Sequence, residues 1–334
     1  MASFKSTQAT QCLIADEAAF GTAIASGGTW NEYPVTSFTM PELSAPVEYS
    51  APRVGRGVNY VMQGHHRPDQ KVYTFDITMK GNTETFLRGC ASFFEDASSV
   101  ATLPANYAFP TTYVHGGSVT TQCSVLFTEV GADATSDLLL TSCVATGMSW
   151  ACDIGSEGGE WTVTLNMMTA YQPTYVNYSQ TNTVNTTAIK NIKDLTCTLN
   201  SGSAETLVMT SFNLDFSRTV ERVHYSESST YRPYGYAMTG VIDVTGSLTC
   251  KRDEELEDVL GTGRFSNSTV CDLQLVDSST AGNFTLDMDR IFLNEPSIDN
   301  GGAFYQSVIP FTAVAGVNYD ATVDDAVVNL TIAN

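Results

Sequence analysis

One strictly alternating stretch decides the fold class, Trp161-Thr162-Val163-Thr164-Leu165-Asn166-Met167. Apolar residues take every second position, as they do in a strand that turns one face to a core and the other to solvent. The same period of two returns in residues 73–79, 212–216 and 241–248. Only 16% of the 334 residues are charged, and Thr, Ser and Asn are frequent, which favours strands and turns over solvated helices. The sequence therefore predicts a mainly β protein.

Two short amphipathic helices are expected among the strands. The first follows a cap at Asn82 or Thr83, and its apolar positions fall on one helical face. These positions are Phe86, Leu87, Cys90, Phe93 and Phe94. The second covers about 253–260, with acidic residues at its start and Gly261 as its stop. Strands with one short helix in each half indicate a sandwich or barrel flanked by a helix.

The two halves of the chain repeat the same order of signals. Residues 36–40 resemble residues 210–214, and each segment is followed by a long turn-rich hairpin, a strand and the helix. Near the end of each half, residues 158–170 align without a gap with residues 301–313. We therefore predict an internal duplication.

The length of the chain suits two domains better than one core. We predict an N-terminal arm at 1–29, a first domain at 30–172, a linker at 173–192 and a second domain at 193–334. The linker is rich in Asn, Thr and Ser and has no apolar period. Each domain is expected to be a β-sandwich or barrel with one short flanking α-helix.

The charge balance and the cysteines limit the kinds of partner. The chain has 16 basic and 36 acidic residues and a formal charge of −20, so its surface repels nucleic acid and anionic membranes at neutral pH. No apolar run has the length of a signal peptide or a membrane helix, so we expect a soluble protein made without Sec-type export. The eight cysteines contain no Cys-x-x-Cys pair and lie in apolar or alternating segments. They are expected to be buried free thiols rather than disulfides or metal ligands.

The sequence shows no constellation of residues that fits an enzymatic reaction. It lacks a phosphate-binding Gly-rich loop with Lys-Ser/Thr, a Gly-x-Ser-x-Gly motif and a His-Glu-x-x-His motif. Asp287 and Asp289 would share one face of a strand, where a solvated or ion-paired surface is a better explanation than acid–base work or cation binding. We therefore predict a protein that is not an enzyme, with no catalytic residue, no metal and no cofactor.

Arginine and tyrosine gather in two long hairpins, at about 41–70 and 216–236. These residue types are enriched at protein interfaces, and loops of this length are usually functional. We predict that the hairpins join subunits. The residues expected to do so are Arg53, Arg56, Arg67, Arg218, Arg222, Arg232, Tyr49 and Tyr225.

Three segments resemble the phage tail tube protein family. Residues 13–22 are similar to the acidic-aromatic-Gly-Thr start of these proteins, residues 51–57 to the loop after their first strand, and residues 238–261 to their strand followed by an acidic helix. The order of these elements along nearly the whole chain carries the resemblance. A tail tube protein with one tube domain is about half as long as this chain. The resemblance therefore fits a member of the family with a duplicated tube domain.

The resemblance implies a structural virion protein of the phage tail. Its sandwich subunits would form stacked rings, with three duplicated chains in a ring, around a hollow conduit for DNA delivery. DNA would pass an acidic lumen without specific binding. Expected partners are further copies of the chain and the tape measure, terminator and distal tail proteins, with assembly in the host cytoplasm. Two alternatives stay open: a tail hub or terminator of the same fold, and a surface adhesin or capsid-decorating sandwich.

Overall fold

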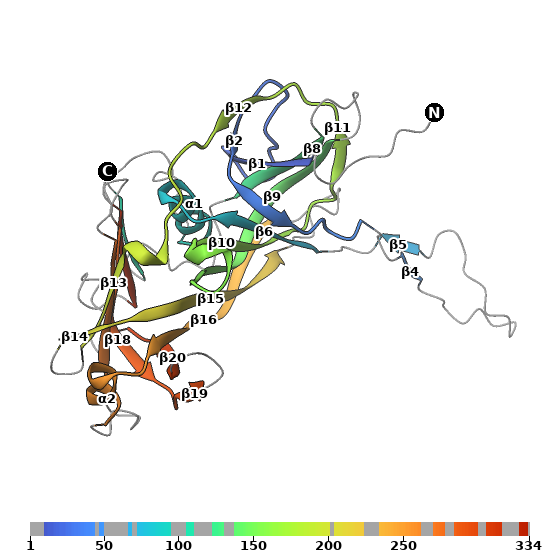
Figure 1. Cartoon of the computed structure of the whole chain (residues 1–334). Helices are drawn as coiled ribbons and strands as arrows, with labels where there is room; N and C mark the ends of the chain where they lie inside the picture. Colours follow the sequence, from blue (N-terminus) through green and yellow to red (C-terminus); the bar gives the residue numbers. More distant parts are fainter. Residues whose placement is uncertain are drawn as a thin grey trace, which may run out of the picture.

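The computed structural model describes residues 10–43, 47–49, 66–68, 72–94, 105–109, 122–129, 137–200, 204–223, 234–261, 270–277, 284–299, 305–315 and 327–332. Within these residues the protein is mainly β, as the alternating pattern predicts. In Figure 1 the strands of the first and second halves lie side by side, α1 packs on the first half, and α2 lies at the far end of the second.

The first half carries the elements that its alternating segments predict, with a few short strands added. They are β1 (Thr10–Asp16), β2 (Thr29–Glu32), β3 (Val35–Phe38), β4 (Val47–Tyr49), β5 (His66–Pro68), β6 (Tyr73–Lys80), α1 (Thr83–Phe94), β7 (Ala105–Phe109), β8 (Cys123–Glu129), β9 (Asp137–Asp153), β10 (Thr162–Thr169), β11 (Thr174–Val176) and β12 (Thr181–Val184). A short 3₁₀ turn, Glu157–Gly159, lies between β9 and β10.

The second half follows after a 3₁₀ turn at Ile192–Asp194. Its elements are β13 (Leu195–Asn200), β14 (Ala204–Leu207), β15 (Met209–Val223), β16 (Gly235–Lys251), α2 (Glu254–Gly261), β17 (Cys271–Asp277), β18 (Phe284–Leu293), β19 (Ser297–Asp299), β20 (Gln306–Ala313) and β21 (Val328–Ile332). In the described residues, the long hairpin expected at 216–236 consists of the end of β15 and the beginning of β16, and residues 224–233 lie outside the described part of the chain.

The described strands of the two halves are paired in the same order. In the first half the neighbours are β1, β8, β9, β10, β6 and β3. In the second half they are β13, β17, β18, β20, β16 and β15. Two further strand pairs also match. β2 pairs with β1 in the first half, and β14 pairs with β13 in the second. Likewise β11 pairs with β9 in the first half, and β21 pairs with β18 in the second. This is the result that an internal duplication predicts.

An irregularity in the ladder repeats as well. Cys123 lies opposite Cys143 in the first half, and Cys271 lies opposite Ile291 in the second. In both pairs the register shifts directly after the cysteine. Such a bulge bends a strand at one defined place, so its presence at matching positions supports a common origin of the two halves.

The strand registers correct the gapless alignment of 158–170 with 301–313 by one residue. That alignment sets Leu165 against Val308. In the structure Leu165 is buried opposite Ile77, and Ile309 is buried opposite Leu248 in the equivalent pair, whereas Val308 points to the other face. Because side chains alternate along a strand, a slip of one residue exchanges core and surface positions. Leu165 therefore corresponds to Ile309.

Both described helices begin at equivalent caps. Asn82 Oδ1 accepts a hydrogen bond from the Thr85 N–H at 2.9 Å, and Asp253 Oδ1 accepts one from the Leu256 N–H at 3.2 Å. Each bond satisfies a backbone donor in the first turn of its helix. The apolar face of α1 is buried as predicted at Phe86, Leu87, Cys90 and Phe93. No helix in the described part of the chain is long and apolar enough to cross a membrane.

The two halves share one sheet in the described residues. β15 of the second half pairs with β9 of the first, and β21 pairs with β7. Buried hydrophobic residues from both halves also form one continuous core cluster. The duplicated units are therefore packed together through main-chain hydrogen bonds and a common core.

The segments predicted to be an arm and a linker supply strands. Residues 10–16 of the predicted arm form β1, in which Leu13 and Ile14 are fully buried. The predicted linker contains β11 and β12, and β12 runs parallel to β2. These linker strands are rich in Thr and Asn and mostly exposed, so no apolar alternation marks them in the sequence.

All eight cysteines are buried and free, as their apolar surroundings predict. Burial raises the pKa of the Cys123 and Cys197 thiols to about 12. A thiol with so high a pKa is almost fully protonated at neutral pH, and the protonated form is a poor nucleophile.

Candidate assembly interface

The contact between the two halves begins with a strand pair. β15 runs antiparallel to the end of β9, from Ser217 opposite Gly147 to Ser211 opposite Asp153. β9 is 17 residues long and β15 is 15. Both strands are therefore long enough to pair within their own half and across the boundary.

Aromatic side chains from both halves fill the layer behind this strand pair. The Phe216 ring lies 5.4 Å from the Trp150 ring and 5.8 Å from the Phe93 ring, measured between centroids. Phe212 lies 5.7 Å from Trp161. Aromatic pairs of this kind contribute about 0.5–1.5 kcal/mol each beyond the burial of their area. Separating the halves would expose all these rings, so the contact is a permanent part of the fold.

Arg218 takes part in this contact from within the fold. Its Nε donates to the Ala145 carbonyl at 2.8 Å, an Nη donates to the Ser92 carbonyl at 3.4 Å, and its guanidinium lies 4.8 Å from the centre of the Phe93 ring. The side chain is 6% exposed. The sequence predicts that Arg218 joins subunits from a long hairpin. In the structure β15 continues to Val223 and holds Arg218 inside the molecule, where its bonds join the two halves of one chain.

Tyr236 joins the halves in a similar way. Its hydroxyl donates to the Ser142 carbonyl at 2.8 Å and accepts from the Ala170 N–H at 2.9 Å. Its ring also meets Phe20 edge to face at 5.1 Å. Burial raises the pKa of Tyr236 above its ordinary value, so the hydroxyl stays protonated and keeps both bonds.

The other predicted interface residues are placed only in part. Arg222 lies on β15, half-buried, and its Nη1 is buried without a hydrogen-bond partner in the described residues. Tyr49 and Arg67 belong to β4 and β5, which pair with each other and lie away from the main sheet (Figure 1). The remaining members lie outside the described residues: Arg53, Arg56, Arg232 and Tyr225. For these residues and Arg222 a role between subunits stays a prediction.

The contact between the halves is asymmetric. The first half contributes β9, whose counterpart in the second half is β18 with β19. The second half contributes β15, whose counterpart in the first half is β3. A contact that joins two different surfaces of equivalent units is heterologous, and such a contact can be repeated from unit to unit.

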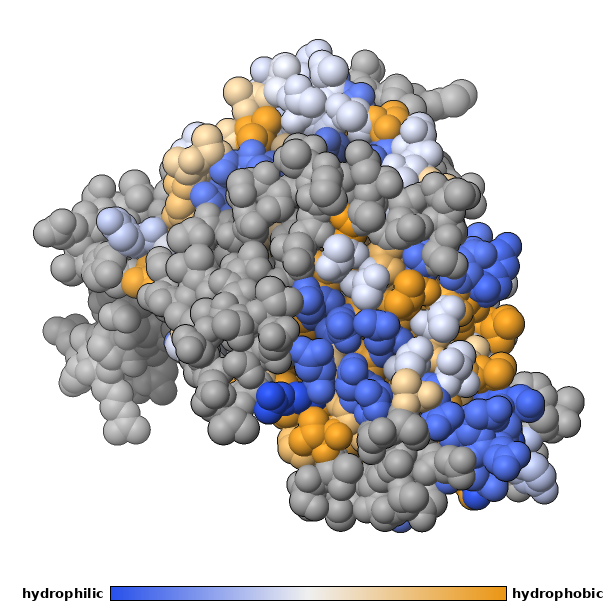
Figure 2. Space-filling view, turned by 90° about the vertical axis from the view of Figure 1, so that its left-hand side faces the viewer, coloured by the Kyte–Doolittle hydropathy of each residue, from blue (hydrophilic) through white to orange (hydrophobic). Residues whose placement is uncertain are grey.

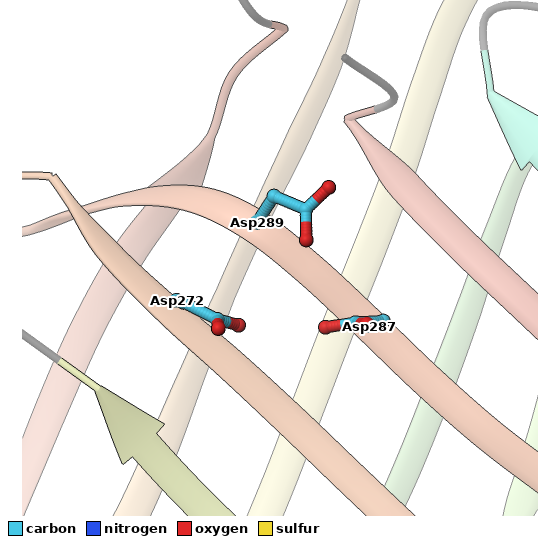
Figure 3. A group of neighbouring side chains, drawn as sticks. All are labelled: Asp272, Asp287 and Asp289. Atoms are coloured by element: carbon cyan, nitrogen blue, oxygen red, sulfur yellow. The ribbon is translucent and has the colours of Figure 1, made fainter. Parts of the chain in front are cut away.

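Asp272, Asp287 and Asp289 form an acidic cluster on the second half. Asp272 comes from β17 and the other two from β18, and their nearest carboxylate oxygens lie within 4.8 Å of one another. The Asp272 and Asp287 carboxylates point toward each other (Figure 3). Burial, and after it the charge of Asp287, raises the pKa of Asp272. Gln274 Nε2 donates to Asp287 Oδ2 at 3.3 Å.

Three carboxylates at this spacing have the donor atoms that a hard cation prefers, but acidic residues also gather on surfaces without one. The sequence pointed to Asp287 and Asp289 through their spacing on one strand. Only the pairing of β17 with β18 adds Asp272.

Hydrophilic residues gather in the middle of the surface seen from the side of the second half (Figure 2).

Two ion pairs tie separate segments together. Arg88 Nη1 on α1 lies 2.6 Å from Asp16 Oδ1 at the end of β1. Lys190 Nζ, just before the second half, lies 2.7 Å from Asp277 Oδ2, and both side chains are almost fully buried. Breaking a buried pair by removing one partner leaves an uncompensated charge, which is strongly destabilising. Both pairs are thus structural.

Comparison with known proteins adds one finding. No protein-family model matches the chain, and no curated protein matches it. Among solved structures, the chain is similar to a protein in the tail of an empty GTA particle with C6 symmetry, at 15% sequence identity and a TM-score of 0.30. The alignment covers 38% of this chain and 96% of the other. A TM-score of 0.30 is too low to establish a common fold.

Proposed function

We propose that the protein is a non-enzymatic structural subunit of a phage tail tube. Copies of the chain would assemble into rings of three chains, and stacked rings would form the hollow conduit through which DNA passes. The observation that carries the proposal is the duplicated fold with its asymmetric contact between β9 and β15. Units joined by such a contact form a closed ring or an open filament when the contact is repeated.

Two properties of the sequence support the same function. The segments 13–22, 51–57 and 238–261 resemble segments of tail tube proteins, and the order of these elements along nearly the whole chain carries the resemblance. The formal charge of −20 would keep DNA from adhering, because each phosphate contact adds affinity. In this proposal the protein belongs to the virion, is assembled in the host cytoplasm, and meets the tape measure, terminator and distal tail proteins.

Electron microscopy of the purified full chain tests the proposal. We expect long hollow rods built of stacked rings, with three chains in each ring. Particles that stay monomeric at every concentration would contradict self-assembly. Single rings that do not stack would instead favour the hub or terminator, and six whole chains in a ring would contradict the use of the duplication.

A further inference from the structure

The second half leaves open the strand edge that the first half uses. Because Leu165 corresponds to Ile309, β19 has the place on β20 that residues 149–151 of β9 have on β10. Ile298 therefore corresponds to Trp150. In β9 these residues pair with β15 on their other side, whereas β19 pairs only with β20 in the described residues.

The first half leaves open the matching edge. Phe38 lies opposite Ile77 and Phe212 lies opposite Leu248, so β3 holds the place of β15. Met40, two residues after Phe38, then corresponds to Leu214. β15 has β16 on one side and β9 on the other, whereas β3 has β6 on one side and no strand pairs with its other edge in the described part of the chain.

Large hydrophobic side chains are exposed at both open edges. Met40 is 51% exposed and Ile298 is 58% exposed, although their counterparts Leu214 and Trp150 are at most 1% exposed and lie opposite each other. Burial of apolar area stabilises an association, and exposed sheet edges with apolar residues are templates for pairing with another chain. Met40 and Ile298 therefore hold the positions of two residues that contact each other elsewhere in the chain, but they make no such contact with each other.

A second pair of residues repeats this relationship. The Gly81 N–H donates to the Trp161 carbonyl at 2.6 Å, and the Arg252 N–H donates to the Tyr305 carbonyl at 3.0 Å, each directly after the equivalent strand. Tyr305 therefore corresponds to Trp161. Trp161 is 1% exposed and packs on Phe212, whereas Tyr305 is 63% exposed.

A hollow beside β3 marks the same place. It has a volume of about 240 Å³ and is lined by Thr10, Gln11, Cys12, Glu32, Tyr33, Val35, Thr36 and Phe38. In the second half Cys197 takes the place of Cys12. At the equivalent place in the second half, Cys152 of the first half lies opposite Phe212 and near Cys197. A side chain from the neighbouring unit thus occupies the region that is hollow in the first half.

We propose that β19 of one copy adds to the next copy as an antiparallel strand at residues 39–41, which continue the open edge directly after β3, with Ile298 opposite Met40. Tyr305 then packs on Phe38 as Trp161 packs on Phe212. The occupant of each edge is a second copy of this chain, because the contact inside the chain already shows which surfaces of the two units fit. The inference rests on the proposed function, since it names the contact that would close the ring.

The contact between copies is built from smaller groups than the contact within a chain. Ile298 and Met40 replace Trp150 and Leu214, and Glu42 corresponds to the buried Phe216. Less apolar area is therefore buried between copies. Each chain would remain folded by itself and join its neighbours reversibly, as a subunit that assembles after synthesis must do.

Disulfide cross-linking between two single variants tests the pairing. Met40→Cys and Ile298→Cys are made separately, mixed and oxidised, and the products are separated without reductant. Residues directly opposite in an antiparallel pair have Cα atoms about 4.5–5.5 Å apart, within the range of about 4.4–6.8 Å that a disulfide accepts. We expect a covalent dimer from the mixture. Each single variant by itself and a mixture of Met40→Cys with Val241→Cys, an even more exposed position on β16, should give none above background.

The outcomes separate this inference from the proposed function. Rods without the cross-linked dimer would overturn the pairing of β19 with residues 39–41 and leave the tube function standing. The dimer without rods would support the pairing and contradict the tube. A chain that stays monomeric and gives no dimer would overturn both. As a second measurement, Ile298→Asp should abolish assembly and leave the melting temperature of the dilute monomer unchanged, because the side chain is exposed there.

Discussion

Leu214 and Trp150 lie opposite each other across the strand pair that joins the two halves, and neither side chain is more than 1% exposed. Leu214 belongs to the second half and Trp150 to the first. Met40, just after β3, and Ile298, on β19, hold the matching positions elsewhere in the chain, so the same contact can be studied both within and between chains. Inside the chain it is part of the fold, and between chains it would be part of the assembly.

Trp150→Ala should strongly destabilise the monomer. Replacing a buried Trp by Ala typically costs about 3–5 kcal/mol, because apolar contacts are lost and a cavity remains. Denaturant unfolding of the dilute protein measures this loss. The matched control is Ile298→Ala at the equivalent, exposed position, which should change the free energy of unfolding by no more than roughly 0.5 kcal/mol. Equal losses in both variants would contradict the assignment of the two edges.

Arg218→Ala should also act on the fold rather than on assembly. Removing the guanidinium removes its hydrogen bonds to the carbonyls of Ala145 and Ser92, and a hydrogen bond to a charged group contributes roughly 1.5–3 kcal/mol. The expected result is a lower melting temperature at every protein concentration. Arg222→Ala is the control from the same strand and should shorten the rods while the melting temperature stays close to that of the parent. A melting temperature of Arg218→Ala equal to that of the parent would contradict the buried role.

Much of the fold follows from the sequence where burial imposes a period. The alternation in residues 161–167 and the apolar face of α1 both identified core positions correctly. The duplication is visible as a repeated order of signals, but the gapless alignment of 158–170 with 301–313 is wrong by one residue. The Gly-Gly and Thr-Ala pairs that both segments contain favour that alignment, although it ignores the side of the strand that each residue faces. Only the cross-strand partners of Leu165 and Ile309 settle that register.

The interface was harder to predict from the sequence. Arg218 is predicted to be an interface residue, and it does join units, but within one chain, as Tyr236 also does. No local signal distinguishes a strand edge that is covered by the other half from one that is open. Ile298 in Ser-Ile-Asp and Met40 before a proline resemble ordinary surface positions. Their exposure becomes informative only when the structure supplies the buried counterparts Trp150 and Leu214.

The eight cysteines should be unreactive in the folded protein and fully titratable after unfolding. Burial raises the pKa of the Cys123 and Cys197 thiols to about 12, and the burial of all eight cysteines excludes the reagent. Thiol titration without reductant should therefore find almost no reaction in native buffer and nearly all eight thiols in denaturant. Fewer than half free in denaturant would contradict the free thiols. This result is also needed for the cross-linking test, since it leaves the introduced cysteines as the reactive ones.

Asp272 should lower the stability of the fold as the pH rises above the pKa that this residue has in the unfolded chain. Its pKa in the folded protein is raised from 3.8, first by burial and then by Asp287, so the folded state binds its proton more tightly than the unfolded state does. Stability is then lost as the pH rises from about the unfolded pKa through the raised folded pKa. At neutral pH the ionised carboxylate therefore opposes folding. Asp272→Asn removes this ionisation with little change of shape.

The variant Asp272→Asn should melt at a higher temperature than the parent at pH 7, and the difference should shrink toward zero as the pH falls below 3.8. Melting curves are recorded with a chelator, so that no cation neutralises the cluster with Asp287 and Asp289. Asp243→Asn, at an exposed position of β16, controls for the loss of one negative charge from a chain of net charge −20. It should raise the melting temperature less, because solvent screens an exposed carboxylate. A lower melting temperature of Asp272→Asn at pH 7 would mean that the carboxylate is favourably bound in the fold, in contradiction to the raised pKa.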